Sequence, residues 1–190
     1  MKKLRKLLSG LKYKLFGARY RTVTGELAGR PLRVIRGTLR PQADKDDAWL
    51  FWLCGRFERI FDIGANIGQT ALVVKVQGAD KKLLAVDANA EALSLAAKNL
   101  ILNGLSASCE FITAFVGDRP DEEVTLYTVG VGAAGSMYRG HAHTAAATGQ
   151  YLRVRTTTLD LLAGQCGWTP DLVKIDVEGA KPKSWKAPFV

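Results

Sequence analysis

An aspartate and the glycine-rich turn behind it are the first residues of this chain whose types and spacing could do chemistry. Asp62 follows the apolar pair Ile60-Phe61, and the turn after it holds Gly64, Asn66 and Gly68. A helical segment comes next, and the amides of its first turn carry partial positive charge. Glycines in such a turn let a ligand approach the backbone closely. This pattern predicts a pocket for a nucleotide-like ligand that carries a carboxylate or a phosphate.

A second carboxylate ends the next apolar stretch. Asp87 follows Leu83–Val86 and lies 19 residues after Gly68. An acid placed about 20 residues beyond a glycine turn, at the end of the second strand, accepts hydrogen bonds from the hydroxyls of a ribose. The alternative is that Asp62 and Asp87 merely terminate two strands. The order of strand, glycine turn, helix, strand and acid favours the ligand site.

The glycine turn differs from the fingerprint of dinucleotide-binding domains, G-x-G-x-x-G. A literal match lies elsewhere, at Gly130–Gly135. No convincing helix follows that match, and Arg153 and Arg155 stand where the ribose acid is expected. We therefore interpret Gly130–Gly135 as a loop, which disfavours a nicotinamide-dependent oxidoreductase.

Predicted strands and helices alternate around these residues, which requires a parallel sheet with right-handed crossovers. The predicted strands cover residues 59–63, 83–87, 110–116, 123–129, 151–157 and 172–177. The predicted helices cover residues 44–57, 69–77 and 90–102, and a small hairpin is expected within 22–40. Gly78 and the pair Asn103-Gly104 are expected to end two of the helices in the left-handed conformation. In such sheets ligands bind beyond the carboxyl ends of the strands, where Asp62 and Asp87 lie.

The first predicted helix raises two expectations of its own. Asp46 or Asp47 is expected to cap its N-terminus. Trp49, Phe51 and Trp52 are expected to pack in the core, as most large aromatic side chains do.

Four stretches, in order along the chain, resemble the motifs of a known family. They are Phe61–Gly68 with Thr70, Leu95–Leu105, Thr158–Asp160 and Asp171–Ala180. Together they resemble the FkbM family of S-adenosylmethionine-dependent methyltransferases, over roughly residues 45–180. The resemblance implies an α/β, Rossmann-like, doubly wound and mostly parallel sheet of the class I methyltransferase type, with a turn at Thr158–Asp160. It also implies S-adenosyl-L-methionine as the cofactor.

The resemblance also implies roles for the glycine turn and for the acid that follows the second strand. Asp62, Gly64, Asn66 and Gly68 would hold the methionine end of the cofactor, and Asp87 would hold its ribose. Many relatives carry Glu at the position of Asp87, so this carboxylate is one methylene shorter. The implied reaction is methyl transfer, usually to a hydroxyl of a sugar or a small natural product.

The predicted strand 172–177 supplies the candidate catalytic residues. Asp176 would lie beside the reacting methyl group, where it could orient a hydroxyl acceptor or accept its proton. Lys174 and Glu178 are expected to support it. The alternative is that Lys174 and Glu178 form an ordinary ion pair at a strand end.

Two histidines close in sequence, His141 and His143, also need an interpretation. Imidazole is a common base and metal ligand. No third ligand at useful spacing accompanies the pair, so no metal site is predicted. A solvated loop is the favoured interpretation, with contact to the acceptor as the alternative.

The positive charge of the chain is concentrated in its first 40 residues. They hold twelve Lys and Arg and one acid, a net charge of +11, whereas the remainder carries −2. Leucines recur at helical spacing between the lysines, at Leu4, Leu7, Leu8, Leu11 and Leu15. Such a segment either rests on an anionic membrane surface or packs on the domain, and the pattern favours neither. No motif for specific nucleic-acid recognition is present.

The domain prediction follows from this division and from the residues behind the last motif. Residues 1–40 form a basic arm and hairpin, 41–180 a cofactor-binding methyltransferase domain, and 181–190 an irregular tail. Three cysteines without a Cys-x-x-Cys pair predict reduced thiols in a cytoplasmic protein, with membrane-surface association left open. No apolar run reaches the roughly 18 residues that span a bilayer.

The tail departs from the family pattern. Pro182 and Pro188 disfavour the helix that the family places there. The last three strands of a seven-stranded sheet would follow it, so we expect a chain that is incomplete at its C-terminus. Strand 172–177 would then be an exposed edge prone to self-association. The alternative functions are a non-catalytic, truncated remnant of a cofactor-binding domain and, less favoured, an RNA methyltransferase. The methyl acceptor is left open.

Overall fold

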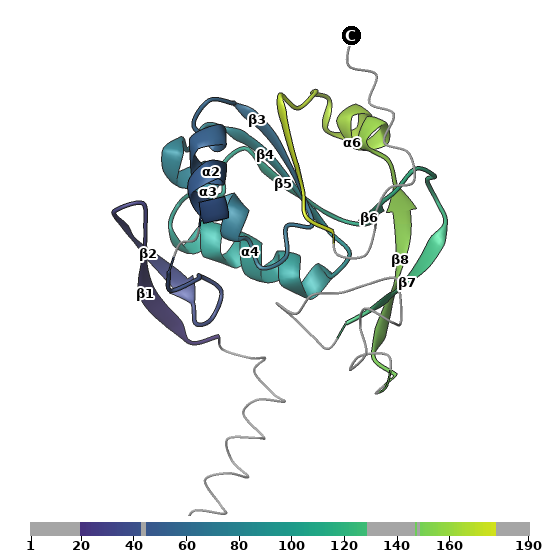
Figure 1. Ribbon diagram of the computed structural model, residues 1–190, viewed down its shortest axis with the longest axis horizontal. Helices are drawn as coiled ribbons and strands as arrows, with labels where there is room; N and C mark the ends of the chain where they lie inside the picture. Colours follow the sequence, from purple (N-terminus) through teal and green to yellow (C-terminus); the bar gives the residue numbers. More distant parts are fainter. Residues whose placement is uncertain (1–19, 43–44, 129–146, 148, 178–190) are drawn as a thin grey trace, which may run out of the picture.

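A parallel four-stranded sheet forms the centre of the computed structural model, which describes residues 20–42, 45–128, 147 and 149–177 (Figure 1). Its order is β5-β4-β3-β9, and all three pairings are parallel. The strands are β3 (Arg59–Ile63), β4 (Lys82–Asp87), β5 (Cys109–Thr113) and β9 (Leu172–Ile175). β3 and β4 are apolar almost throughout because helices cover both of their faces. The predicted α/β fold with a mostly parallel sheet is confirmed.

Helices cover the two faces of this sheet unequally. The helices are α2 (Lys45–Cys54), α3 (Gln69–Gln77), α4 (Ala90–Leu102) and α6 (Leu159–Cys166). Ile60 and Leu83 pack with residues of α2, α3 and α4, whereas Phe61 and Leu84 pack with Leu162 of α6. Alternate strand residues therefore serve two cores on opposite faces of the sheet (Figure 1).

The predicted hairpin is present and is joined to α4 by a buried asparagine. It consists of β1 (Thr22–Leu27) and β2 (Arg30–Ile35), which pair antiparallel. The Ile35 N–H donates to Asn99 Oδ1 at 2.8 Å, and Asn99 Nδ2 donates to Thr38 Oγ1 at 2.8 Å. Asn99 is fully buried, so its amide has exchanged water for these two partners.

A second, smaller sheet has the order β6-β8-β7. Its strands are β6 (Phe115–Val116), β7 (Glu123–Tyr127) and β8 (Tyr151–Thr157), with β7 and β8 antiparallel. The prediction of one strand over 110–116 is wrong, because the chain changes sheets at Ala114. The Ala114 N–H donates to the carbonyl of Asp87 at 3.1 Å, and β6 then pairs with β8.

Three other local predictions are corrected by the structure. Asp46 and Asp47 lie inside α2 and do not cap it, and Asp47 pairs with Arg40 at 3.3 Å. Gly78 is extended, whereas Gly104 is left-handed as predicted. Helix α6 begins directly after Thr158, whose hydroxyl accepts from the Leu161 N–H, at a place where a turn was expected.

The aromatic residues of α2 are exposed, so the prediction that they belong to the core is wrong. Trp49 is 65% exposed, Trp52 is 48% exposed and Phe51 is 37% exposed. The two tryptophan rings meet edge to face, and the guanidinium of Arg56 lies 3.5 Å from the centre of the Trp52 ring. Helix α2 packs on α3 mainly through its other side chains, including Leu50 and Cys54.

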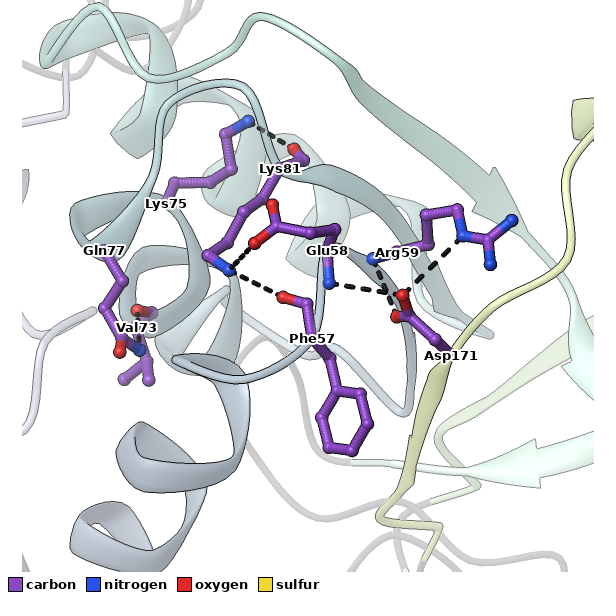
Figure 2. Close-up of polar contacts among 8 residues, drawn as sticks. All are labelled: Phe57, Glu58, Arg59, Val73, Lys75, Gln77, Lys81 and Asp171. Carbon is purple, nitrogen blue, oxygen red and sulfur yellow. Dashed lines mark hydrogen bonds and ion pairs between the residues drawn. The ribbon is translucent and has the colours of Figure 1, made fainter.

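Charged side chains connect the N-terminal ends of β3, β4 and β9, at the edge of the sheet opposite to the predicted ligand site (Figure 2). Lys81 Nζ donates to the Phe57 carbonyl at 2.6 Å and to Glu58 Oε1 at 2.9 Å. Asp171, just before β9, accepts from the Arg59 N–H at 2.8 Å. These contacts fix the register of β3, β4 and β9 at their N-terminal ends. The register in turn determines how the opposite ends of β3 and β4, which carry Asp62 and Asp87, are placed relative to each other.

Within the described ranges, no helix has the length and hydrophobicity needed to cross a bilayer.

Candidate cofactor site

The loop after β3 folds against the ends of the strands on both sides of it. The Gly64 N–H donates to the Val86 carbonyl of β4 at 2.8 Å. On the β9 side, a Cβ at Gly64 would overlap the carbonyl oxygen of Asp176 and lie 2.8 Å from its carbonyl carbon. Gly64 also has a φ of +77°, so only glycine combines this conformation with this close approach.

Asn66 and Asp87 are in direct contact. The Asn66 N–H donates to Asp87 Oδ2 at 2.8 Å, and the Asn89 N–H donates to Asp87 Oδ1 at 2.8 Å. Asn66 reaches this position in the left-handed conformation, with a φ of +48°, which asparagine tolerates better than most residues. Each carboxylate oxygen of Asp87 keeps a lone pair free of these two bonds. A partly exposed carboxylate of this kind can accept from a pair of neighbouring hydroxyls.

Gly68 begins α3 without a side-chain cap. Its φ is +90°, and a Cβ there would come within 2.6 Å of the Ala96 Cβ on α4. The glycine therefore lets α3 and α4 pack closely. Because Gly68 has no side chain, the N-cap residue supplies no side-chain acceptor to the first amides of α3. Both glycines of the predicted turn are required by backbone geometry.

Asp62 is fully buried beside the loop. Among the described residues, no donor has hydrogen-bond geometry to either of its carboxylate oxygens. Lys174 Nζ lies at ion-pair distance, 3.1 Å from Asp62 Oδ1. Burial raises the pKa of Asp62 above its usual range, the Lys174 ammonium opposes this rise, and the carboxylates of Asp87 and Asp176 add to it. A buried acceptor with an uncommitted oxygen fits the ammonium group of a ligand.

Lys174 lies at the centre of the charged groups at this end of the sheet. Its Nζ donates to the Gly64 carbonyl at 3.3 Å and lies 3.5 Å from Asp176 Oδ2, in addition to its contact with Asp62. Parallel pairing of β3 with β9 places Lys174 directly beside Asp62. The sequence motifs did not predict this pair. The signal was available, because both residues lie near the ends of strands that the fold makes neighbours.

Asp176 follows β9 and differs from Asp62 in its exposure. Its N–H donates to the Ile63 carbonyl at 2.9 Å, which fixes the backbone next to the loop. Its side chain is 68% exposed and can meet a molecule that approaches from solvent.

The structure thus brings together most of the predicted site residues: Asp62, Gly64, Asn66, Gly68, Asp87, Lys174 and Asp176. Glu178, His141, His143 and the glycine match at 130–135 lie outside the described residues. Within the described residues, no group of three or more potential metal ligands lies close enough to hold a metal ion.

A parallel α/β sheet whose first strand ends in a buried acid and a glycine turn, with a second acid beside that turn, defines a nucleoside-binding domain. The model of the methyltransferase FkbM domain matches residues 62–180, so this chain belongs to the FkbM methyltransferase family. The cofactor of the family is S-adenosylmethionine.

Several solved structures are similar to parts of the chain. One is an S-adenosylmethionine-dependent methyltransferase from Agrobacterium tumefaciens, with 20% identity and a TM-score of 0.42, covering 53% of this chain and 34% of that one. Another is the O-methyltransferase TomG from Streptomyces achromogenes, in complex with its cofactor, with 19% identity and a TM-score of 0.33, covering 37% and 33%. A third is TYW2 from P. horikoshii in complex with MeSAdo, with 13% identity and a TM-score of 0.39, covering 64% and 52%.

The chain therefore spans about a third to a half of the length of these proteins. The search of the curated proteins found no match.

Proposed function

We propose that this chain binds S-adenosylmethionine at the ends of β3 and β4 and transfers its methyl group to a hydroxyl of a sugar or small natural product. The contact between the Asn66 amide and the Asp87 carboxylate supports this proposal most directly, because it joins the glycine turn to the expected ribose acid. The buried and incompletely partnered Asp62 adds an acceptor for the ammonium group of the methionine moiety.

Each residue then has a task that its environment suits. Asp87 keeps acceptor capacity for the two ribose hydroxyls after accepting two backbone amides. Asp62 offers a buried negative charge, and Gly64 and Gly68 let the loop pack against Asp176 and α4, which fixes the position of the loop backbone. S-adenosylmethionine, when bound, supplies an electrophilic methyl group on a sulfonium centre.

Asp176 is the proposed catalytic residue. Methylation of a hydroxyl releases a proton, and an exposed carboxylate beside the loop can orient the hydroxyl and accept that proton. Lys174, 3.5 Å away, limits the repulsion between Asp176 and the other carboxylates of the site. Glu178 is proposed to support this pair from its place two residues beyond Asp176 in the sequence.

Calorimetric titration with S-adenosylhomocysteine tests the binding step, with NADH as the control ligand. We expect saturable binding of the former and none of the latter. A methyl-transfer assay with hydroxylated acceptors then separates an enzyme from a non-catalytic remnant, which would bind without turnover. RNA methylation predicts an affinity for RNA that falls steeply with salt.

We also infer that the basic N-terminal region rests on an anionic membrane surface. All five arginines between residues 20 and 42 are exposed, namely Arg21, Arg30, Arg33, Arg36 and Arg40. The aromatic side chains of α2 are exposed too, and the hairpin and α2 pack on one hydrophobic cluster, so both flank the same part of the molecule. Basic residues together with tryptophan are typical of membrane-surface segments.

Flotation with vesicles tests this attachment. We expect binding to phosphatidylserine vesicles, no binding to phosphatidylcholine vesicles, and weaker binding of a W49S/W52S variant. Equal recovery with both lipids would contradict the inference, and RNA binding in place of lipid binding would favour a nucleic acid as the partner.

A further inference from the structure

We propose that Lys174 is a positioning residue that keeps Asp62 ionised in its buried position, so that the carboxylate can accept the ammonium group of the cofactor. This inference rests on the proposed function and assigns Lys174 to cofactor binding, in addition to any support that it gives Asp176. It also predicts how cofactor affinity depends on pH, which the family assignment does not.

The geometry places the lysine where it can act on Asp62 more strongly than on Asp176. Its Nζ is 3.1 Å from Asp62 Oδ1 and 3.5 Å from Asp176 Oδ2, and it is anchored by the Gly64 carbonyl at 3.3 Å. The Asp62 side chain is fully buried, whereas that of Asp176 is largely exposed to water. Solvent screens the second pair far more than the first, so the lysine matters most to Asp62.

Among the described residues, every other titratable group that faces Asp62 disfavours its negative charge or is neutral. The carboxylates of Asp87 and Asp176 raise its pKa from the ends of β4 and β9. Cys54 faces it from α2, and burial followed by the Asp62 charge raises the pKa of that thiol to about 11, so the thiol is uncharged at neutral pH. Lys174 is thus the one cation among the described residues that offsets the burial of Asp62.

Loss of the lysine would therefore raise the pKa of Asp62 further. The pKa of Asp62 is higher in the folded protein than in the unfolded chain. Protonated Asp62 therefore stabilises the fold at pH values below the unfolded-state pKa, and this contribution is lost as the pH rises through the folded-state pKa. In Lys174→Met the folded-state pKa should be higher, so this contribution should be lost over a range that reaches higher pH. The protonated carboxyl would no longer attract a cationic ligand group.

The test compares Lys174→Met with Lys174→Arg and with Lys82→Met. Lys82 is exposed on β4, and the described part of the chain holds no ion pair between it and Asp62, so it controls for the loss of one positive charge. Carbon-13 NMR of the aspartate carboxyls measures the ionisation midpoint of Asp62 without ligand, with Asp62→Asn to assign the signal. Calorimetry measures the affinity for S-adenosylhomocysteine between about pH 5.5 and 7.5, where the amine of the ligand stays protonated.

We expect a higher Asp62 midpoint in Lys174→Met and a midpoint near the wild-type value in the other two variants. We expect the affinity of Lys174→Met to be lowest at acid pH and to rise by up to about tenfold per pH unit, approaching wild type at high pH. An unchanged midpoint, or a loss of affinity that is the same at every pH, would overturn the proposal. Failure of the wild-type protein to bind S-adenosylhomocysteine would refute the proposed function instead, and the NMR midpoints would still decide whether Lys174 controls the charge of Asp62.

Discussion

Replacement of Gly64 by alanine tests the close packing of the glycine loop against Asp176. The new methyl group would overlap the Asp176 carbonyl oxygen, which belongs to the backbone and cannot rotate away. The end of β9 would have to move from β3, and this would weaken the bond from the Asp176 N–H to the Ile63 carbonyl. The variant should therefore lose both stability and cofactor affinity.

The expected size follows from three contributions. Alanine at a φ of +77° costs about 1–2 kcal/mol, the overlap costs about 1–3 kcal/mol, and a weakened backbone hydrogen bond costs about 1 kcal/mol. We expect a total of about 3–6 kcal/mol. Gly29 provides a matched control, because its φ is +74° and no atom lies within 4 Å of the place that a Cβ would take there. Gly29→Ala should cost only the conformational term, about 1 kcal/mol after the entropy lost by the unfolded chain is included.

Urea unfolding of both variants, followed by circular dichroism, measures the difference. The effect of alanine on the unfolded chain is common to both and cancels in the comparison. Calorimetry with S-adenosylhomocysteine on the folded fraction then reports the change at the site. Equal stabilities of Gly64→Ala and Gly29→Ala would refute the close approach between the loop and Asp176.

Three further predictions follow from the described contacts. Asp87→Asn retains one acceptor oxygen for two backbone amides, so calorimetry should show an affinity for S-adenosylhomocysteine lower by about tenfold or more, and an unchanged affinity would exclude Asp87 from the site. Asn99→Leu leaves the buried partners of the Asn99 amide unsatisfied and should lower the free energy of unfolding by about 2–4 kcal/mol. Asn103 is more exposed, so Asn103→Leu should lower it by only about 1 kcal/mol. Equal losses in the two variants would contradict the role of burial. β9 is an edge strand of the described sheet and Ile175 is 39% exposed, so sedimentation velocity should show association that grows with concentration and diminishes in Ile175→Lys; a monodisperse monomer with a sharp thermal transition would oppose this.

Much of the central sheet was predictable because its signals are local. β3, α3 and α4 have the predicted bounds, since buried apolar runs, a glycine turn and an asparagine at the end of α4 mark them in the sequence. The contact between Asn66 and Asp87 also follows from order along the chain, because the ends of neighbouring parallel strands meet at one edge of the sheet.

Other features depend on partners that are distant in the sequence. The change of sheet at Ala114 is decided by pairing of β6 with β8, some 40 residues later. Exposure of Trp49 and Trp52 depends on which side of α2 meets α3, and that helix is apolar on more than one side. The ion pair of Lys174 with Asp62 joins residues 112 positions apart and appears only when β9 takes its place beside β3.

A crystal structure of this protein with S-adenosylhomocysteine would test the proposed cofactor site most directly. We predict that the ribose hydroxyls lie within hydrogen-bond distance of the Asp87 carboxylate and that the amino group of the ligand lies beside Asp62. A nucleoside bound away from the loop between these two aspartates, or with its ribose turned from Asp87, would contradict the proposed site.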